Sequence, residues 1–493
     1  MAKSRAQTHT GWLVMLFLAG DNNLGEEMVA TLQDILAEGA PDDDRIVAQF
    51  DPSGLGIATQ RYDFKPSRRK SSLDDFRVRF DGKESSTGNP DALIAFVKWA
   101  TERHPDPGLK RLLILSGHGS GTTQDFLLKD ENAMDALSIP ELGTALKAIT
   151  QNGKQKIDIL GFDACFMSMG EVAYEIRKYV EVVVGAEGEE PGFGWPFRRL
   201  LGLIKAERAS TRRPMDTHRM AEAAVEAYID HYAPFDRAAG RSVDLAAIDL
   251  NGLKRVVDRF ADLAKQLIGI SRPDHDRMLL AHWYAQTYKF DQFVDLRDLC
   301  VQVSKQFGRK HRVSKAAESV VEALQKCVIK SGCSGFAYQH SHGLSIYFPW
   351  ALVSPDYKKL QFGADTHWHK FLRDHLEATR REQRHTSEPV EAAHQADPRK
   401  LLKHLHDGFA IRIASAIDAA EHSDIPREDV PREVARRLFS ASPAGRRVSR
   451  FSDNTRFSDN TRFSDNTRFP GDRERSVKNL PPSTGVTFEP PSS

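Results

Sequence analysis

The feature that most constrains the fold is an alternation of short apolar runs with helix-like stretches over the first 205 residues. Apolar runs predict strands at 12–18, 45–50, 59–64, 111–116, 156–161 and 180–186. Between them, apolar residues at helical spacing predict helices at 24–38, 89–103, 139–150 and 167–179. Strands that alternate with helices are typical of a mostly parallel sheet covered on both faces. We therefore expect a three-layer α/β core over residues 1–205.

Composition and charge narrow the class of protein. The chain has 493 residues, is 40% hydrophobic and carries a formal net charge of only +1. A nearly neutral chain has no general attraction for nucleic acid or for an anionic membrane, so we expect neither as a partner. Four cysteines are too few for a disulfide framework and fit a reducing compartment.

The apolar run at 12–20 has two interpretations. Basic residues precede it, as they do in a secretory signal peptide. The run is too short to span a bilayer, and the sequence Asp-Asn-Asn at 21–23 follows it with a turn and a helix cap. We predict a buried first strand and a cytoplasmic protein. The alternative is a secreted protein in which residues 1–20 act as the signal.

Longer helical patterns follow the predicted core. They occur at 215–232, 253–268 and 313–327, with strand-like pieces at 242–248 and 344–348. We expect residues 206–375 to form a helical C-terminal subdomain that packs on the core or completes its sheet.

The composition changes again near residue 376. Over residues 376–493, the sequence predicts a charged linker, two short helices and a tail. In this tail the sequence RFSDNT occurs three times. Three copies of a six-residue repeat can bury almost no core, so we expect the tail to be disordered. Its arginines, Arg456, Arg462 and Arg468, would be accessible to a protease that cuts after basic residues.

Two chemically reactive side chains follow separate apolar runs. His118 follows the run at 112–115, and Cys165 follows the run at 157–160. Parallel neighbouring strands would bring both side chains to the same carboxyl edge of the sheet. A histidine beside a thiol is the minimum that a cysteine nucleophile needs.

Each step of such chemistry has a candidate group. The predicted helix at 167–179 would place Cys165 at a helix N-terminus, where the dipole favours the thiolate. His118 would protonate the leaving amine and then activate water. The backbone N–H groups of Gly119 and Cys165 are candidate oxyanion donors. The alternative interpretation is a small buried cysteine and a turn histidine.

Four segments, in this order, resemble the clostripain family of cysteine endopeptidases, which belongs to the caspase-like clan. They are WLVMLFLAGDNN at 12–23, SGHGSG at 116–121, GFDAC at 161–165 and EGEEPGFGW at 187–195. Shorter matches, VDL at 294–296 and GLSIYFP at 343–349, extend the resemblance over residues 12–350. It implies a caspase-like three-layer sandwich and cleavage after Arg or Lys through a thioester. Cys165 would be the nucleophile and His118 the acid/base.

The same resemblance implies residues that bind substrate. Asp163 maps to the acidic floor of the S1 pocket, where it could pair with an arginine of the substrate; its alternative role is a helix N-cap. Relatives often carry a second acid in a PGDGW-like stretch, where this chain has Phe193. An aromatic ring holds a cation only weakly. Glu190 or Glu187 could supply the missing charge.

Self-cleavage is implied by analogy, because many relatives mature in this way. The candidate sites are Lys129, Lys147, Lys154 and Lys156. The natural partner would be a protein or peptide with a basic P1 residue. A different function also fits the sequence: a catalytically weak caspase-like module that recruits partners through its tail. The tail could instead occupy the active site in cis.

We expect no cofactor, although some relatives depend on calcium. Carboxylates at 42–44 and 130–131 lack the EF-hand pattern, so we name no metal ligand. The remaining cysteines lie near two histidines but lack the paired spacing of a zinc site. These residues are Cys300, Cys327, Cys333, His340 and His342.

Overall fold

The computed structural model describes residues 10–383, except 42, 55–56, 65–71, 81–85, 123–126, 235–236, 289–291 and 351, together with 462–463. The longest strand of its main sheet is the interior strand β1 (Gly11–Gly20), which is buried along its whole length. Alternate residues of β1 face two separate apolar clusters, Met15 in one and Leu16 in the other. The strand predicted at 12–18 is therefore confirmed. Removal of residues 1–20 as a signal peptide would take a buried interior strand out of the sheet.

The other strands of this sheet are short. They are β2 (Arg45–Pro52), β3 (Gln60–Phe64), β4 (Arg77–Val78), β5 (Leu109–Ser116), β8 (Ile157–Asp163), β9 (Val180–Gly185), β10 (Val243–Asp249), β13 (Val328–Ser334) and β15 (Arg462–Phe463). Their order is β15-β13-β10-β9-β8-β5-β1-β2-β3-β4. The five strands from β9 to β2 are parallel, and the flanking strands are antiparallel. The mostly parallel sheet expected from the sequence is confirmed.

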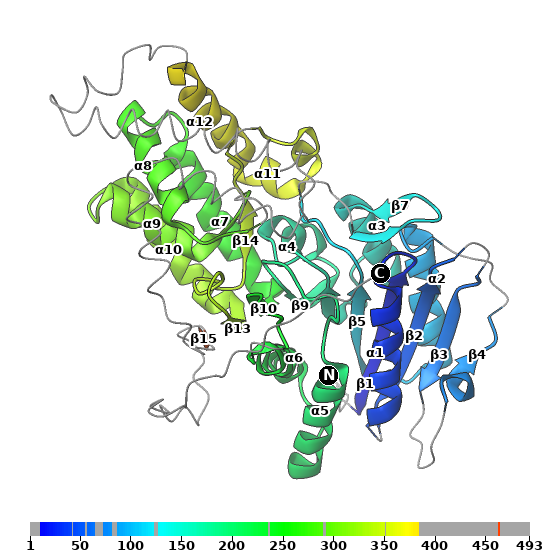
Figure 1. Ribbon diagram of the computed structural model, residues 1–493. Helices are drawn as coiled ribbons and strands as arrows, with labels where there is room; N and C mark the ends of the chain where they lie inside the picture. The colour runs from blue at the N-terminus through cyan, green and yellow to red at the C-terminus, as the bar shows by residue number, and fades with distance from the viewer. Residues whose placement is uncertain are drawn as a thin grey trace, which may run out of the picture.

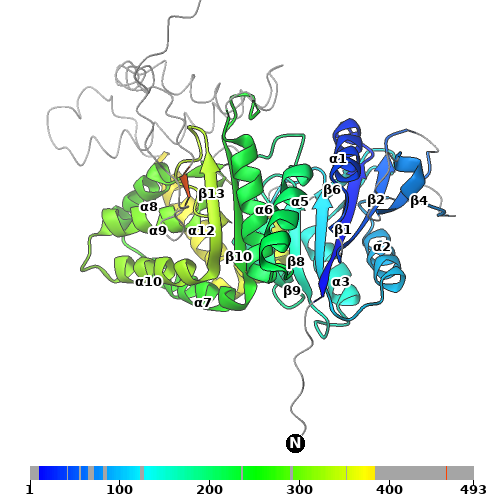
Figure 2. The same ribbon diagram turned by 90° about the horizontal axis from the view of Figure 1, so that it is seen from below.

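Helices cover both faces of the sheet (Figures 1 and 2). One face packs against α1 (Gly25–Glu38), α5 (Phe197–Thr211) and α6 (Thr217–Tyr232). The other packs against α2 (Pro90–Arg103), α3 (Ile139–Ile149), α4 (Gly170–Ile176) and α7 (Leu250–Leu267). This arrangement is the predicted three-layer α/β sandwich. No helix among the described residues has the length and apolar character that a membrane span requires.

The C-terminal part contributes both strands and helices. Its β10 and β13 lengthen the main sheet, and β11 (Thr287–Tyr288), β12 (Phe293–Asp295) and β14 (Ser345–Tyr347) form a second small sheet. Its remaining helices gather beside α7 (Figure 1). They are α8 (Arg272–Tyr284), α9 (Leu296–Phe307), α10 (Arg312–Cys327), α11 (Gln361–Thr366) and α12 (Trp368–Gln383).

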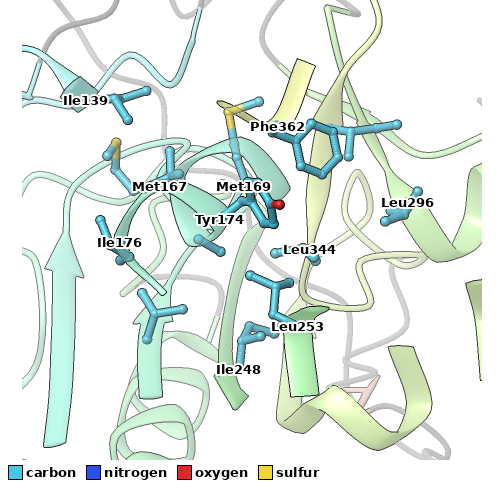
Figure 3. Packing of buried hydrophobic residues seen from close by; sticks show 14 of the residues in the cluster. Ile139, Met167, Met169, Tyr174, Ile176, Ile248, Leu253, Leu296, Leu344 and Phe362 are labelled. Carbon is cyan, nitrogen blue, oxygen red and sulfur yellow. The ribbon is translucent and has the colours of Figure 1, made fainter. Parts of the chain in front are cut away.

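This C-terminal part packs on the segment that follows Cys165. Met169 shares an apolar cluster with Leu344 and Phe362 (Figure 3). Ser345 N–H donates to the carbonyl of Ser168 at 3.0 Å. The packing therefore fixes the loop on which the thiol sits.

Residues 376–383, at the start of the predicted linker segment, instead form the end of α12, so this helix extends past the predicted boundary. The rest of the predicted linker, the short helices and the disordered tail lie outside the described residues, except for Arg462–Phe463. These two residues pair with β13 as β15, which the sequence did not predict. A hairpin of β6 (Leu127–Asp130) and β7 (Asp135–Leu137) was also not predicted. It lies between β5 and α3 in the chain.

Candidate active site

The reactive histidine and cysteine follow strands that end side by side. Ser116, the last residue of β5, is the register partner of Asp163, the last residue of β8. Gly117 N–H donates to the carbonyl of Asp163 at 3.1 Å, which extends the pairing by one residue. His118 and Cys165 each come two residues after their strand. The parallel sheet therefore places both at one carboxyl edge.

Close backbone contact joins the two segments beyond the strands. A Cβ added to Gly119 would lie 2.5 Å from the carbonyl oxygen of Cys165 and 3.2 Å from Cβ of Ala164. Any side chain at this position would push the histidine segment away from the cysteine segment. Glycine next to His118 is therefore required by the approach of the two segments, as its lack of a side chain suggested.

The thiol of Cys165 is held by the loop after β9. The side chain is half-buried, and the backbone N–H of Glu190 donates to Sγ at 3.3 Å. A hydrogen bond to the charged form of a group favours that form, so this contact favours the thiolate. The protonated thiol can instead donate to the carbonyl of Glu190, at the longer distance of 3.9 Å. The sequence did not predict these contacts, because a backbone group 25 residues away leaves no side-chain signal.

The expectation that Cys165 lies at a helix N-terminus is wrong. The helix predicted at 167–179 is α4, which begins only at Gly170. Phe166 has a φ of +61°, and Ser168 N–H donates to the carbonyl of Ala186 at 2.8 Å. These residues form an irregular segment bound to the end of β9, so the helix dipole does not act on the sulfur at close range.

His118 lies half-buried and contacts an asparagine. Its Nε2 is 2.7 Å from Oδ1 of Asn23, which follows β1. Burial lowers the pKa of the imidazole, and the positive charge of Lys129 lowers it further. The ring is therefore neutral at neutral pH, as a general base must be.

Two carboxyl groups lie together next to the nucleophile. Asp163 is buried and accepts hydrogen bonds from Ser116 Oγ at 2.7 Å and Trp195 N–H at 3.0 Å. Burial raises the pKa of Asp163 to about 6. Burial and the charge of Asp163 raise the pKa of Glu190 well above its ordinary value. At neutral pH the pair therefore carries one negative charge, mainly on Asp163.

No cation of the protein balances this pair within the described part of the chain. Neither Asp163 nor Glu190 forms an ion pair with Lys or Arg there, and both oxygens of Glu190 lack a hydrogen-bond donor. The helix N-cap interpretation of Asp163 is wrong, because Met169 is the N-cap of α4.

The other two residues considered for the S1 pocket have different surroundings. Phe193 is 70% exposed. Its neighbour Gly194 has a φ of +65°, and an added Cβ would lie 2.5 Å from Oδ1 of Asp163. Glu187 is fully buried and accepts a hydrogen bond from Gly343 N–H at 2.7 Å. Glu190, and not Glu187, is therefore the second acid beside Asp163.

The residues considered for metal binding do not come together. In the part of the chain that is described, no group of three or more His, Cys, Asp or Glu side chains is arranged to hold a metal ion. Cys327 donates to the carbonyl of Asp249 at 3.2 Å, and His342 contacts Asp295. Asp130 accepts from the backbone N–H groups of Thr87 and Ala133. Position 42 lies outside the described residues.

Known structures share this architecture. Over 73% of this chain, the inactive zymogen C11 protease of Parabacteroides distasonis superimposes with a TM-score of 0.53 and 16% identity, covering 99% of that structure. A secreted C11 cysteine protease of Bacteroides thetaiotaomicron, in complex with an irreversible peptide inhibitor, gives a TM-score of 0.54 and 18% identity over the same shares. These likenesses establish the fold.

Sequence comparison gives the family. Clostripain from Hathewaya histolytica is 22% identical over 410 residues, which cover 71% of this chain and 76% of that protein. The model of the clostripain family matches residues 16–375. This range includes His118 and Cys165 as well as the acids Asp163 and Glu190. The resemblance noted in the sequence is thereby confirmed. The chain belongs to the clostripain family and is a cysteine peptidase.

Proposed function

We propose that the chain is an endopeptidase that cleaves proteins or peptides after Arg or Lys. The observation that carries the proposal is the buried acid pair of Asp163 and Glu190, which has no cation of its own among the described residues. Asp163 ends the strand that leads to Cys165, and the backbone of Glu190 contacts the sulfur. A P1 side chain that enters beside the thiol would therefore meet a carboxylate with which a guanidinium or ammonium group can pair.

The proposed reaction uses four groups at this edge. The neutral imidazole of His118 takes the proton of the Cys165 thiol, the thiolate attacks the scissile carbonyl, and the backbone N–H groups of Gly119 and Cys165 stabilise the oxyanion. The imidazolium of His118 then gives this proton to the leaving amine as the peptide C–N bond breaks, which leaves a thioester on the enzyme and a neutral ring. The neutral imidazole then takes a proton from water, and the resulting hydroxide releases the acid product.

A set of P1 peptides tests the specificity. The peptides differ only at P1, which is Arg, Lys or citrulline. Citrulline has nearly the shape of Arg but lacks its charge. We expect the wild type to prefer Arg over citrulline, and Asp163→Asn to lose on the order of 100-fold or more in kcat/KM for Arg, because a buried charge then lacks its partner. Cys165→Ala serves as the blank. Equal rates on Arg and citrulline would contradict the basic P1 preference.

Self-cleavage is part of the proposal, and the fold separates the four candidate sites. Lys129 lies in β6. The residue before it, Leu128, donates its backbone N–H to the carbonyl of His118, so Lys129 lies near the catalytic edge. Residues 147–156 lead from the end of α3 to the start of β8, at the opposite edge. Cleavage there requires a second molecule.

The protein concentration during maturation distinguishes the two routes. Cleavage after Lys129 within one molecule proceeds at a rate independent of concentration, whereas cleavage at 147–156 accelerates with concentration. Mass spectrometry of the products assigns the sites, with Cys165→Ala as the uncleaved control. An intact chain that hydrolyses peptides would contradict the need for self-cleavage.

We further propose that catalysis needs no metal. We expect EDTA and added calcium to leave the hydrolysis of the Arg peptide unchanged; loss of activity in EDTA with recovery in calcium would contradict this. The compartment stays a prediction from the sequence, which cell fractionation tests.

A further inference from the structure

The turn that follows β1 reaches the catalytic histidine. Oδ1 of Asn23 lies 2.7 Å from Nε2 of His118. An amide oxygen can only accept a hydrogen bond, so Nε2 carries the proton in this contact and Nδ1 is the basic nitrogen. We propose that Asn23 is a positioning residue that fixes the ring orientation and the tautomer of His118. The inference rests on the acid/base role proposed for His118.

The two residues before Asn23 anchor its backbone. Asn22 is buried, and its Nδ2 donates to the carbonyls of Ala19 at 2.9 Å and Lys129 at 2.8 Å. The carbonyl of Asp21 accepts from Glu131 N–H at 2.9 Å. These bonds fasten the turn to β1 on one side and to the β6–β7 hairpin on the other. The backbone that carries Asn23 is therefore held in place relative to the histidine.

Asn23 itself is exposed and fills no part of the core. Its contact with His118 is therefore not a by-product of packing, and its removal creates no cavity. The two residues lie 95 positions apart in the chain, so the sequence alone could not pair them. This combination of an exposed side chain on an anchored turn suits a residue that orients another group.

The chemistry also favours an amide over a carboxylate at this position. The charged groups near His118 are Lys129, which lowers its pKa, and Glu131, which raises it; Cys165 lies across the catalytic edge. A neutral amide accepts the Nε2 proton without adding charge, so the ring stays neutral and basic. A carboxylate in its place would favour the imidazolium and raise the pKa of His118.

The test compares Asn23→Ala and Asn23→Asp with the wild type. We expect Asn23→Ala to lower kcat on the order of 10- to 100-fold with little change in KM, because part of the acid/base contribution is lost. Asn23→Asp should retain more activity than Asn23→Ala and shift the acid limb of the pH profile to higher pH. Asn251→Ala, at an exposed position on α7, is the matched control and should match the wild type.

Two results would overturn the inference. The first is a kcat of Asn23→Ala equal to that of the Asn251→Ala control. The second is a pH profile of Asn23→Asp whose acid limb lies at the same pH as that of the wild type. The pH dependence of Cys165 alkylation by iodoacetamide is measured on the same variants. That readout needs no P1 residue, so an error in the proposed specificity would not be mistaken for a failure here.

Discussion

A buried carboxyl behind the nucleophile loop gives the protein a predictable response to pH. Glu171 lies in α4 and is fully buried. Its Oε1 accepts hydrogen bonds from Tyr347 N–H at 3.0 Å and Tyr357 Oη at 2.8 Å. Within the described residues, Oε2 has no partner. Burial raises the pKa of Glu171 from 4.5 to about 7, in spite of the two hydrogen bonds.

The sign of the effect follows from proton binding. Between the unfolded pKa of 4.5 and the folded pKa of about 7, the folded chain holds a proton that the unfolded chain has released. Rising pH through this window therefore lowers the free energy of unfolding. At roughly 1.4 kcal/mol for each pKa unit, the full loss is about 3 kcal/mol. Below pH 4.5, Glu171 is protonated in both the folded and the unfolded chain, and this loss of stability is absent.

Glu171→Gln removes this titration and keeps the acceptor for both tyrosines. We expect the parent protein to lose about 2–3 kcal/mol more than Glu171→Gln between about pH 5 and pH 8. Urea unfolding followed by tryptophan fluorescence measures this, in a Cys165→Ala background that prevents self-digestion. The other buried carboxyls titrate in both proteins and cancel in the comparison. Equal losses of stability in the two proteins would show that Glu171 does not cause this pH dependence.

Three further predictions concern the active site. Glu190→Gln should keep kcat/KM for the Arg peptide within about threefold of the wild type at neutral pH, because the raised pKa of Glu190 already leaves it protonated. A loss as large as that of Asp163→Asn would show that Glu190 carries the charge. Gly119→Ala should lower kcat on the order of 100-fold, because its Cβ forces the two catalytic segments apart; unchanged kinetics would contradict the close approach. Because the pKa of Asp163 is about 6, KM for the Arg peptide should fall as pH rises through that value, whereas KM for the citrulline peptide should not. The same pH dependence for both peptides would assign the effect to another group.

Much of the catalytic edge could be predicted from periodicity. Runs of apolar residues mark buried parallel strands, and the topology of such a sheet brings His118 and Cys165 to one edge. The glycine beside the histidine was also informative, because close approach of two segments requires a missing side chain.

The helix after the nucleophile could not be predicted correctly from the same signal. Met169 has helical spacing with Val172 and Ile176 of α4, but Met167 and Met169 are buried in the cluster with the C-terminal part of the chain. Tertiary contacts to residues such as Leu344, far along the sequence, decide this segment. Local apolar periodicity therefore predicted a longer helix than α4.

The groups around the reactive side chains depend on contacts between distant segments. The backbone N–H of Glu190 against the sulfur and the amide of Asn23 against the imidazole join different loops of the fold. The choice between Glu187 and Glu190 as the partner of Asp163 depends on which face of one loop is buried against which neighbour. Sequence spacing carries no information on these contacts.

The central claim is that Cys165 and His118 act together at one edge of the sheet. An arginyl peptide with an alkylating ketone, added to the wild type, Cys165→Ala and His118→Ala, tests it most directly when the modified residue is identified by mass spectrometry. We expect one label on Cys165 in the wild type, much slower labelling in His118→Ala, and none in Cys165→Ala. Labelling of another residue, or equal rates in the wild type and His118→Ala, would contradict it.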